Sequence, residues 1–138
     1  MISARNKIRG VVSEVVPGAV MGIVKVDAGE KEHLSATISM ESVKDLRLEQ
    51  GKKVVAVVKA TEIMLAKDYV TISARNQLKG MVVSVEKGAV NAIVKLDVPG
   101  GIGITSTVSI EAVDQLGIKV GQPAVAVIKA TSVMIAAD

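Results

Sequence analysis

The feature that most constrains the fold of this 138-residue chain is an internal repeat with an offset of 70 residues. The segment ISARNKIRG at 2–10 returns as ISARNQLKG at 72–80, and VAVVKATEIMLAKD at 55–68 returns as VAVIKATSVMIAAD at 125–138. The alignment needs no gap, and about 30 of its 68 residue pairs are identical. A repeat at a fixed period indicates that one structural unit is built twice. We therefore predict two domains, 1–68 and 69–138, joined by almost no linker.

Each repeat has the pattern of a small β-protein. Apolar and β-branched runs are bounded by Gly, Pro or charged residues, as is typical of strands. In the first repeat, strands are expected at about 3–16, 19–27, 33–40 and 52–66, the last of them bent or broken in two.

The segment 40–51 differs from the strands and predicts one short helix. Ser39 or Ser42 can cap its start, and Gly51 stands where it would stop. Residues 110–121 of the second repeat have the same pattern. The order β-β-β-α-β(β) in fewer than 70 residues fits a Greek-key barrel of the OB type. The predicted fold class is all-β, with two tandem OB-like Greek-key β-barrels, each with one short helix.

The composition narrows the classes of site that the chain can hold. It is 49% hydrophobic, yet it has no Phe, Trp or Cys, and its only histidine is His33. Disulfides, thiolate metal sites and multi-histidine sites are therefore excluded within one chain. With a single histidine and scattered carboxylates, no catalytic set can be built, so an enzyme is not expected.

The location and the class of partner also follow from the composition. No uncharged apolar stretch is long enough for a membrane helix, and the first ten residues are charged where a signal peptide would be apolar. A cytoplasmic protein without membrane contact is therefore expected. The net charge is only +3, and the aromatic platforms of single-strand binders are missing, which argues against a nucleic-acid partner and suits a small anion.

The core must be aliphatic, and many strand residues are apolar on both faces. The candidates for the core are Val11, Val15, Ile23, Val24, Ile38, Val55, Val57, Ile63 and Leu65. Strands that are apolar on both faces must be covered on both. Oligomerisation is therefore expected, with the alternative that the two tandem units cover each other.

Comparing the two copies shows which polar residues were kept. The first repeat has 11 basic residues and the second has 6, but Arg5, Lys25 and Lys59 are matched by Arg75, Lys95 and Lys129. The tetrapeptide Ser-Ala-Arg-Asn occurs in both copies, and its residues are Ser3, Arg5 and Asn6 in the first repeat and Ser73, Arg75 and Asn76 in the second. In an extended segment, the Ser and Arg side chains point to one face and can hold a tetrahedral oxyanion together. The alternative is a surface arginine with a structural serine.

A second shared motif ends the last apolar run of each repeat. It consists of Lys59, Ala60 and Thr61 in the first copy and Lys129, Ala130 and Thr131 in the second. Its lysine either reaches solvent or faces an anion. The hydroxyls of Ser39, Ser42 and Ser109 lie at the entry to the short helix, where they are donors to an anion or ordinary helix caps.

These motifs resemble the Mop domain of the molbindins, a family of small cytoplasmic molybdate-binding proteins. The resemblance rests on ISARN, GAV after the first turn, the hydroxyl segment before SVKDL, and VVKAT, and it covers both repeats. It implies an OB-like fold and assembly about a threefold axis, so that a chain with two domains forms a trimer, a pseudo-hexamer of Mop domains. It also implies a storage or buffering role, with molybdate as ligand and tungstate as an alternative.

The resemblance also implies which residues hold the anion. The expected oxyanion ligands are Ser3, Arg5, Ser39, Ser42 and Lys59 of the first repeat and Ser73, Arg75, Ser109 and Lys129 of the second. The neighbouring Asn6, Asn76, Ala60, Ala130, Thr61 and Thr131 complete the candidate set. Ser42 is matched by Ala112, so the two classes of site are expected to differ in affinity. Two alternative functions remain open, an OB-type module that binds single-stranded nucleic acid and a structural oligomer without a ligand.

Overall fold

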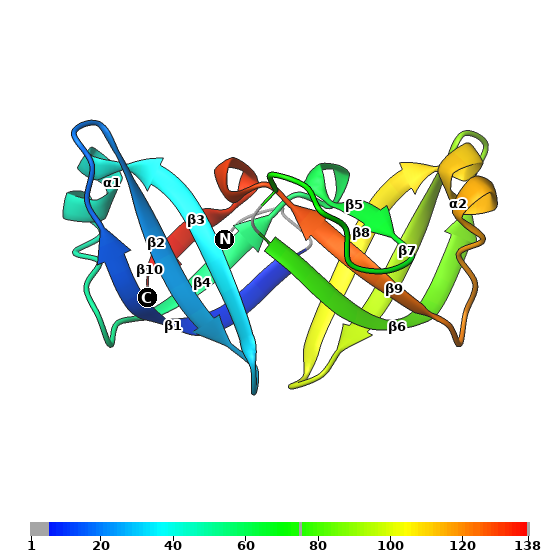
Figure 1. Ribbon diagram of the computed structural model, residues 1–138, viewed down its shortest axis with the longest axis horizontal. Coiled ribbons are helices and arrows are strands. Elements are labelled where there is room, and N and C mark those ends of the chain that lie inside the picture. Colours follow the sequence, from blue (N-terminus) through cyan, green and yellow to red (C-terminus); the bar gives the residue numbers. More distant parts are fainter. Residues whose placement is uncertain (1–5, 75, 138) are drawn as a thin grey trace.

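In the computed structural model of the chain, which describes residues 6–74 and 76–137, two curled antiparallel sheets of five strands lie side by side. Figure 1 shows the two barrels along the long axis, with the helices α1 and α2 at opposite ends. No helix within the described ranges has the length and apolar character needed to cross a membrane.

The elements follow the same order in both repeats. The first repeat contains β1 (Asn6–Val16), β2 (Met21–Ala28), β3 (Glu32–Ser39), α1 (Met40–Asp45), β4 (Lys53–Val58), the 3₁₀ turn η1 (Ala60–Glu62) and β5 (Met64–Ala66). The second contains β6 (Asn76–Lys87), β7 (Asn91–Val98), β8 (Ile102–Ser109), α2 (Ile110–Leu116), β9 (Pro123–Ile128), η2 (Ala130–Ser132) and β10 (Met134–Ala137). The predicted fold class, two tandem OB-like barrels with one short helix each, is confirmed.

The last short strand of each repeat pairs with the other repeat. The strand orders are β10-β4-β1-β2-β3 and β5-β9-β6-β7-β8, so β5 completes the second barrel and β10 the first. Met134 pairs with Val57, and Met64 pairs with Val127. The break predicted within 52–66 is confirmed, and η1 is the point where the chain crosses over. The sequence did not predict this exchange, because the two short strands are nearly identical and either fits either barrel.

Two equivalent asparagines join the barrels. Asn6 on β1 is 1% exposed, and its side-chain amide donates to the Thr105 carbonyl at 2.8 Å and accepts from the Thr105 N–H at 2.7 Å. Asn76 on β6 is also 1% exposed and makes the same pair of bonds with Ser35, at 2.8 and 2.7 Å. Because Ser35 and Thr105 are 70 residues apart, the two barrels are related by an approximate twofold axis.

The core is aliphatic, as the composition predicted, but its membership differs in part. Val24, Val57 and Ile63 are fully buried, whereas Val11 is 39% exposed. Val15, Ile23, Ile38, Val55 and Leu65 are half-buried. On β1 the inward side chains are Ile8 and Val12, and the register shifts between Val12 and Glu14. Adjacent valines such as Val11 and Val12 give no alternation, so the sequence could not tell which of them faces inward.

Two of the strands that are apolar on both faces, β4 and β9, are covered within the chain. Val57 on β4 is 1% exposed, and Val125 and Val127 on β9 are at most 3% exposed. These two strands therefore follow the alternative in which the tandem units cover each other, whereas Val11 on β1 is left exposed and the oligomeric state stays a prediction. Large apolar side chains are exposed elsewhere, with Val20 at 75% and its counterpart Val90 at 72%.

The helices begin as the sequence predicted and end earlier. The Ser39 hydroxyl caps α1 by accepting from the Ser42 N–H at 3.1 Å, and Ser109 caps α2 in the same way. The expected stop at Gly51 is wrong, because α1 ends at Asp45. In the second repeat, Gly117 ends α2 with a left-handed conformation at φ 64°, which is common for glycine after a helix.

Arg47 occupies the position equivalent to Gly117 and is left-handed too, at φ 52°. The left-handed conformation destabilises the folded state by about 1–2 kcal/mol when the residue has a Cβ. Glycine avoids this cost, but it loses more conformational entropy on folding, so the net gain from a glycine is smaller. We expect Arg47→Gly to raise the free energy of unfolding by about 0.5–1 kcal/mol, measured by thermal or denaturant unfolding. The matched change Gly117→Ala should lower it by a similar amount; a loss of stability in Arg47→Gly would contradict the argument.

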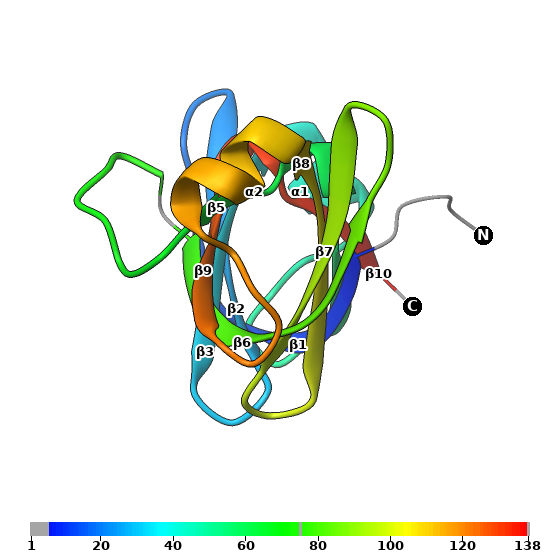
Figure 2. The same ribbon diagram turned by 90° about the vertical axis from the view of Figure 1, so that its right-hand side faces the viewer.

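The joint between the repeats projects from the side of the molecule (Figure 2). Asp68 accepts from the Tyr69 N–H at 2.8 Å and pairs with Lys79 at 3.0 Å, and the Lys79 amino group lies 5.4 Å from the centre of the Tyr69 ring. The Tyr69 hydrogen bond, followed by the interactions with Lys79, lowers the pKa of Asp68. The joint is therefore attached to the outer face of β6.

Candidate anion-binding site

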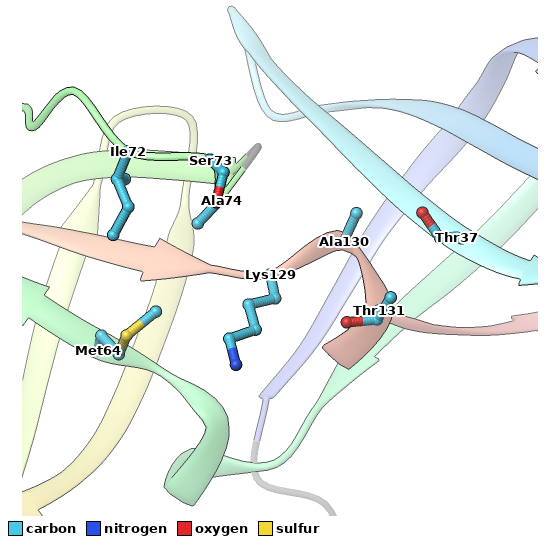
Figure 3. Close-up of a pocket in the computed structure, with 8 residues that line it drawn as sticks. All are labelled: Thr37, Met64, Ile72, Ser73, Ala74, Lys129, Ala130 and Thr131. Atoms are coloured by element: carbon cyan, nitrogen blue, oxygen red, sulfur yellow. The ribbon is translucent and has the colours of Figure 1, made fainter.

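A cavity of about 350 Å³ lies where the two barrels meet. Its walls bring together polar and apolar residues from both repeats, and Figure 3 shows all of them. They are Thr37, Met64, Ile72, Ser73, Ala74, Lys129, Ala130 and Thr131. Four of these, Ser73, Lys129, Ala130 and Thr131, belong to the predicted set of ligands.

The fold explains how these residues meet. Ser73 and Ala74 precede β6, and Lys129 directly follows β9. The strands β6 and β9 are neighbours in the sheet. The turn η2 then carries Ala130 and Thr131 across to the first barrel, where it packs against β3 and so faces Thr37. The cavity therefore depends on the same crossover that exchanges the short strands.

The donors in this cavity suit a small anion. Lys129 is the one cation among the described residues that line it, and in Figure 3 its side chain lies between Met64 and Thr131. The hydroxyl-bearing side chains of Ser73, Thr37 and Thr131 complete the polar part. Lysine and hydroxyl groups both donate hydrogen bonds, as an oxyanion requires.

A second cavity, of about 360 Å³, adjoins the first and lies on the approximate twofold axis. It is lined by Lys59, Glu62, Lys129, Thr131, Ser132 and Met134. The equivalent residues Glu62 and Ser132 meet there, and the Ser132 hydroxyl donates to the Glu62 carboxylate at 3.1 Å. The two motif lysines are thus brought into one cavity, although they are 70 residues apart in sequence.

The other predicted residues that the structure describes lie outside these two cavities. Ser39 and Ser109 serve as helix caps, and the Ser39 hydroxyl also donates to Ser42 at 2.9 Å. Ser109 borders a separate apolar cavity of about 250 Å³, together with Ala112. Thr61 is exposed on η1, and Ala60 is buried beside it.

Asn6 and Asn76 use their side-chain amides to join the barrels. They therefore hold the two walls of the candidate site in place and do not line its cavity. Ser3, Arg5 and Arg75 lie outside the described residues.

Sequence reasoning missed four residues of the first cavity. Thr37 is kept as Thr107 in the second repeat, and this shared hydroxyl was the available signal. Ile72 and Ala74 lie in the shared ISARN motif and Met64 recurs as Met134, but an apolar side chain that recurs is equally explained by packing and so carries no sequence mark of a binding role. Among residues 6–74 and 76–137, no group of three or more His, Cys, Asp or Glu is placed to hold a metal cation.

Comparison with known proteins gives a consistent family. The model of the TOBE domain matches the chain twice, at residues 2–65 and 72–135. The probable molybdenum-pterin-binding protein of Haemophilus influenzae is 60% identical over 67 residues, which cover 97% of that protein and 49% of this chain. The molybdenum transport protein ModE of Herbaspirillum seropedicae is 38% identical over 136 residues, which cover 97% of this chain and 51% of that protein.

The chain thus spans about half the length of ModE. A crystal structure of the cytoplasmic molybdate-binding protein ModG with molybdate bound matches over 99% of both chains, with 47% identity and a TM-score of 0.96.

Proposed function

Because the chain belongs to the TOBE-domain family, with one domain in each repeat, we propose that it binds molybdate without chemical conversion and serves to store or buffer it in the cytoplasm. The observation that carries this proposal is the cavity between the barrels, where Ser73 and Lys129 of the second repeat meet Thr37 of the first. The likeness to ModG with molybdate bound over the whole chain supports the choice of anion.

The charge requirement of the anion fits the residues near the cavity. Molybdate is a dianion at neutral pH, so a site shielded from water needs about two positive charges or several N–H and O–H donors. Lys129 supplies one charge within the cavity. Arg75, two residues after Ser73 in the sequence, is proposed to supply the other. Hydroxyl donors then favour a tetrahedral oxyanion, and tungstate, which is nearly the same size, is expected to bind too.

The two repeats are proposed to form two classes of site. In the first repeat, Ser3, Arg5, Ser39, Ser42 and Lys59 are the proposed ligands, and in the second repeat they are Ser73, Arg75, Ser109 and Lys129. Because Ser39, Ser42 and Ser109 lie outside the two central cavities, we propose that their hydroxyls reach a site from a neighbouring chain of the assembly. The Ser42 hydroxyl has no counterpart at Ala112. One donor fewer predicts the weaker affinity for the site to which Ala112 belongs.

We propose that the working form is a homotrimer, with 1–68 and 69–138 as the two domains of each chain. Exposed apolar residues recur at equivalent positions, with Met64 at 38% and Met134 at 39% in addition to Val20 and Val90. Met64 and Ile72 also border the first cavity. A second chain packed on them would cover an apolar surface and close the mouth of the site at once.

The direct test is calorimetric titration of the metal-free full chain with molybdate, tungstate, sulfate and phosphate. We expect molybdate and tungstate to bind at micromolar concentration or below, and sulfate to bind much more weakly, because the cavity must separate anions by size. Native mass spectrometry of the same samples gives the number of chains and of bound anions.

Equal affinity for sulfate and molybdate, or no binding of any oxyanion, contradicts the proposed function. Binding of single-stranded oligonucleotide that weakens with salt favours the nucleic-acid alternative instead.

A further inference from the structure

A second cleft runs along the outer face of β1, away from the candidate site. It consists of two adjoining cavities of about 290 and 340 Å³ that share Arg9 and Gly29. We name it the β1 cleft, and it is lined by Lys7, Ile8, Arg9, Gly10, Val11, Asp27, Gly29, Lys53, Val54, Gly100, Gly101, Ile102 and Gly103. Each cavity is near the lower end, about 300 Å³, of the range for small-molecule sites.

The alternation of β1 gathers cations in this cleft. Ile8 is 3% exposed and points into the core, so Lys7 and Arg9 on either side of it point outward together. Lys53 on β4 pairs with Val11 on β1 and adds a third basic residue beside the 340 Å³ cavity of the cleft. Three basic residues of the first repeat therefore line one continuous surface.

These cations are not neutralised within the chain. Among the described residues, 6–74 and 76–137, no acidic group lies within salt-bridge distance of Lys7, Arg9 or Lys53. Asp27 borders the 340 Å³ cavity and adds one negative charge there, with its carboxylate 2.7 Å from the His33 ring nitrogen, so three cations of the cleft face one carboxylate. The cleft therefore has a positive charge that is available to a ligand.

The hairpin tips of the two barrels form the opposite wall, and Figure 1 shows them close together at the lower edge of the molecule. A Cβ on Gly100 would lie 2.6 Å from the backbone nitrogen of Glu30 and 2.9 Å from the Cα of Gly29, so the tips fit together only with glycine there. A Cβ on Gly101 or Gly103 would meet nothing within 4 Å. The wall thus presents bare backbone to open space.

The equivalent surface of the second barrel lacks this chemistry. Lys7 is matched by Gln77, Lys53 by Pro123, and Arg9 by Lys79. Lys79 is already paired with Asp68 at 3.0 Å. The glycines at 100, 101 and 103 are matched by Glu30, Lys31 and His33. The approximate symmetry keeps the backbone but not the charges, so each chain has one such cleft.

We infer that the β1 cleft binds a phosphomonoester that has an apolar body, one per chain. Lys7 and Arg9 provide charge-assisted hydrogen bonds for the phosphate in the 290 Å³ cavity of the β1 cleft, and the arginine fork fits the phosphate oxygens. Val11, which is 39% exposed, gives the adjoining cavity an apolar side chain for the body of the ligand. This inference is independent of the proposed oxyanion function, since the cleft and the candidate site share no residue.

Adenosine 5′-monophosphate is a suitable probe, with adenosine and inorganic phosphate as its two halves. We expect calorimetry on the full chain to give one bound monophosphate per chain, with an affinity about tenfold or more above that of either half. The variant Lys7→Gln/Arg9→Gln removes the cations. Gly103→Glu places a carboxylate in open space at a position where the backbone φ is not positive. Both should abolish binding of the monophosphate.

The control variant Lys119→Gln changes an exposed lysine outside the cleft and should bind the monophosphate normally. Molybdate affinity and thermal stability should stay unchanged in all three variants, which separates this inference from the proposed function. The inference is overturned if the monophosphate fails to bind at millimolar concentration, if inorganic phosphate or adenosine binds equally well, or if folded Gly103→Glu retains binding.

Discussion

Replacing Asn6 by alanine is expected to lower the free energy of unfolding by about 3 kcal/mol, because each buried backbone group left without a partner costs about 1–3 kcal/mol. The change removes the bonds of 2.7 and 2.8 Å to Thr105, and also the bond of 3.2 Å to the Val58 carbonyl. Asn76→Ala should lower it by a similar amount through Ser35. For a domain pair of this size, the melting temperature should fall by on the order of 10 °C for each variant.

Thermal unfolding at one protein concentration, without added oxyanion, measures this effect, since ligands and association both raise the apparent stability. Asn91→Ala is the matched control, because Asn91 is an exposed asparagine at the start of β7. It should change the free energy of unfolding by less than about 0.5 kcal/mol. If Asn6→Ala is as stable as Asn91→Ala, then the asparagines do not hold the barrels together.

Replacing Lys129 by alanine is expected to weaken molybdate binding roughly tenfold to a hundredfold, as a lost charge-assisted hydrogen bond is worth about 1.5–3 kcal/mol. Lys129 lines both cavities between the two barrels. Because its side chain is exposed, replacing it should leave the fold intact. Calorimetric titration with molybdate, together with the melting temperature of the unliganded variant, measures both effects.

Lys95→Ala is the control for this prediction. Lys95 is also kept in both repeats, as Lys25, but it lies on β7 away from the two cavities. A decrease in molybdate affinity that is equal in the two variants would show that only the net charge matters. Lys59→Ala should also weaken molybdate binding, because Lys59 is the proposed lysine ligand of the first repeat and shares the second cavity with Lys129.

Some residues of the candidate site could be predicted from the sequence, and others are brought there only by the fold. The recurrence of Lys129-Ala130-Thr131 and of Ser73 at an offset of 70 could be predicted to matter, because function keeps residues that packing does not require. Thr37 was visible as a shared hydroxyl, but its place opposite η2 was not. That place depends on the crossover of the chain between the barrels, which involves contacts between residues far apart in sequence.

Asn6 and Asn76 show the same division. Their recurrence was visible in the sequence and was interpreted as part of an anion site. In the fold, their amides complete the hydrogen bonding of backbone groups in the opposite barrel. A side-chain amide can bind an anion or a peptide group equally well, so only the position of the second barrel decides between the two.

The sequence by itself determined the duplicated unit, the order of strands and helix along each repeat, the capped start of the short helix and the aliphatic character of the core. These follow from periodicity, turn residues and caps, all of which act over a few residues. Only the tertiary structure decided that β5 and β10 are exchanged, that Val12 rather than Val11 faces inward, and that Lys7, Arg9 and Lys53 line one cleft. The physical reason is that two equal repeats offer equal local choices, and only contacts between the barrels select among them.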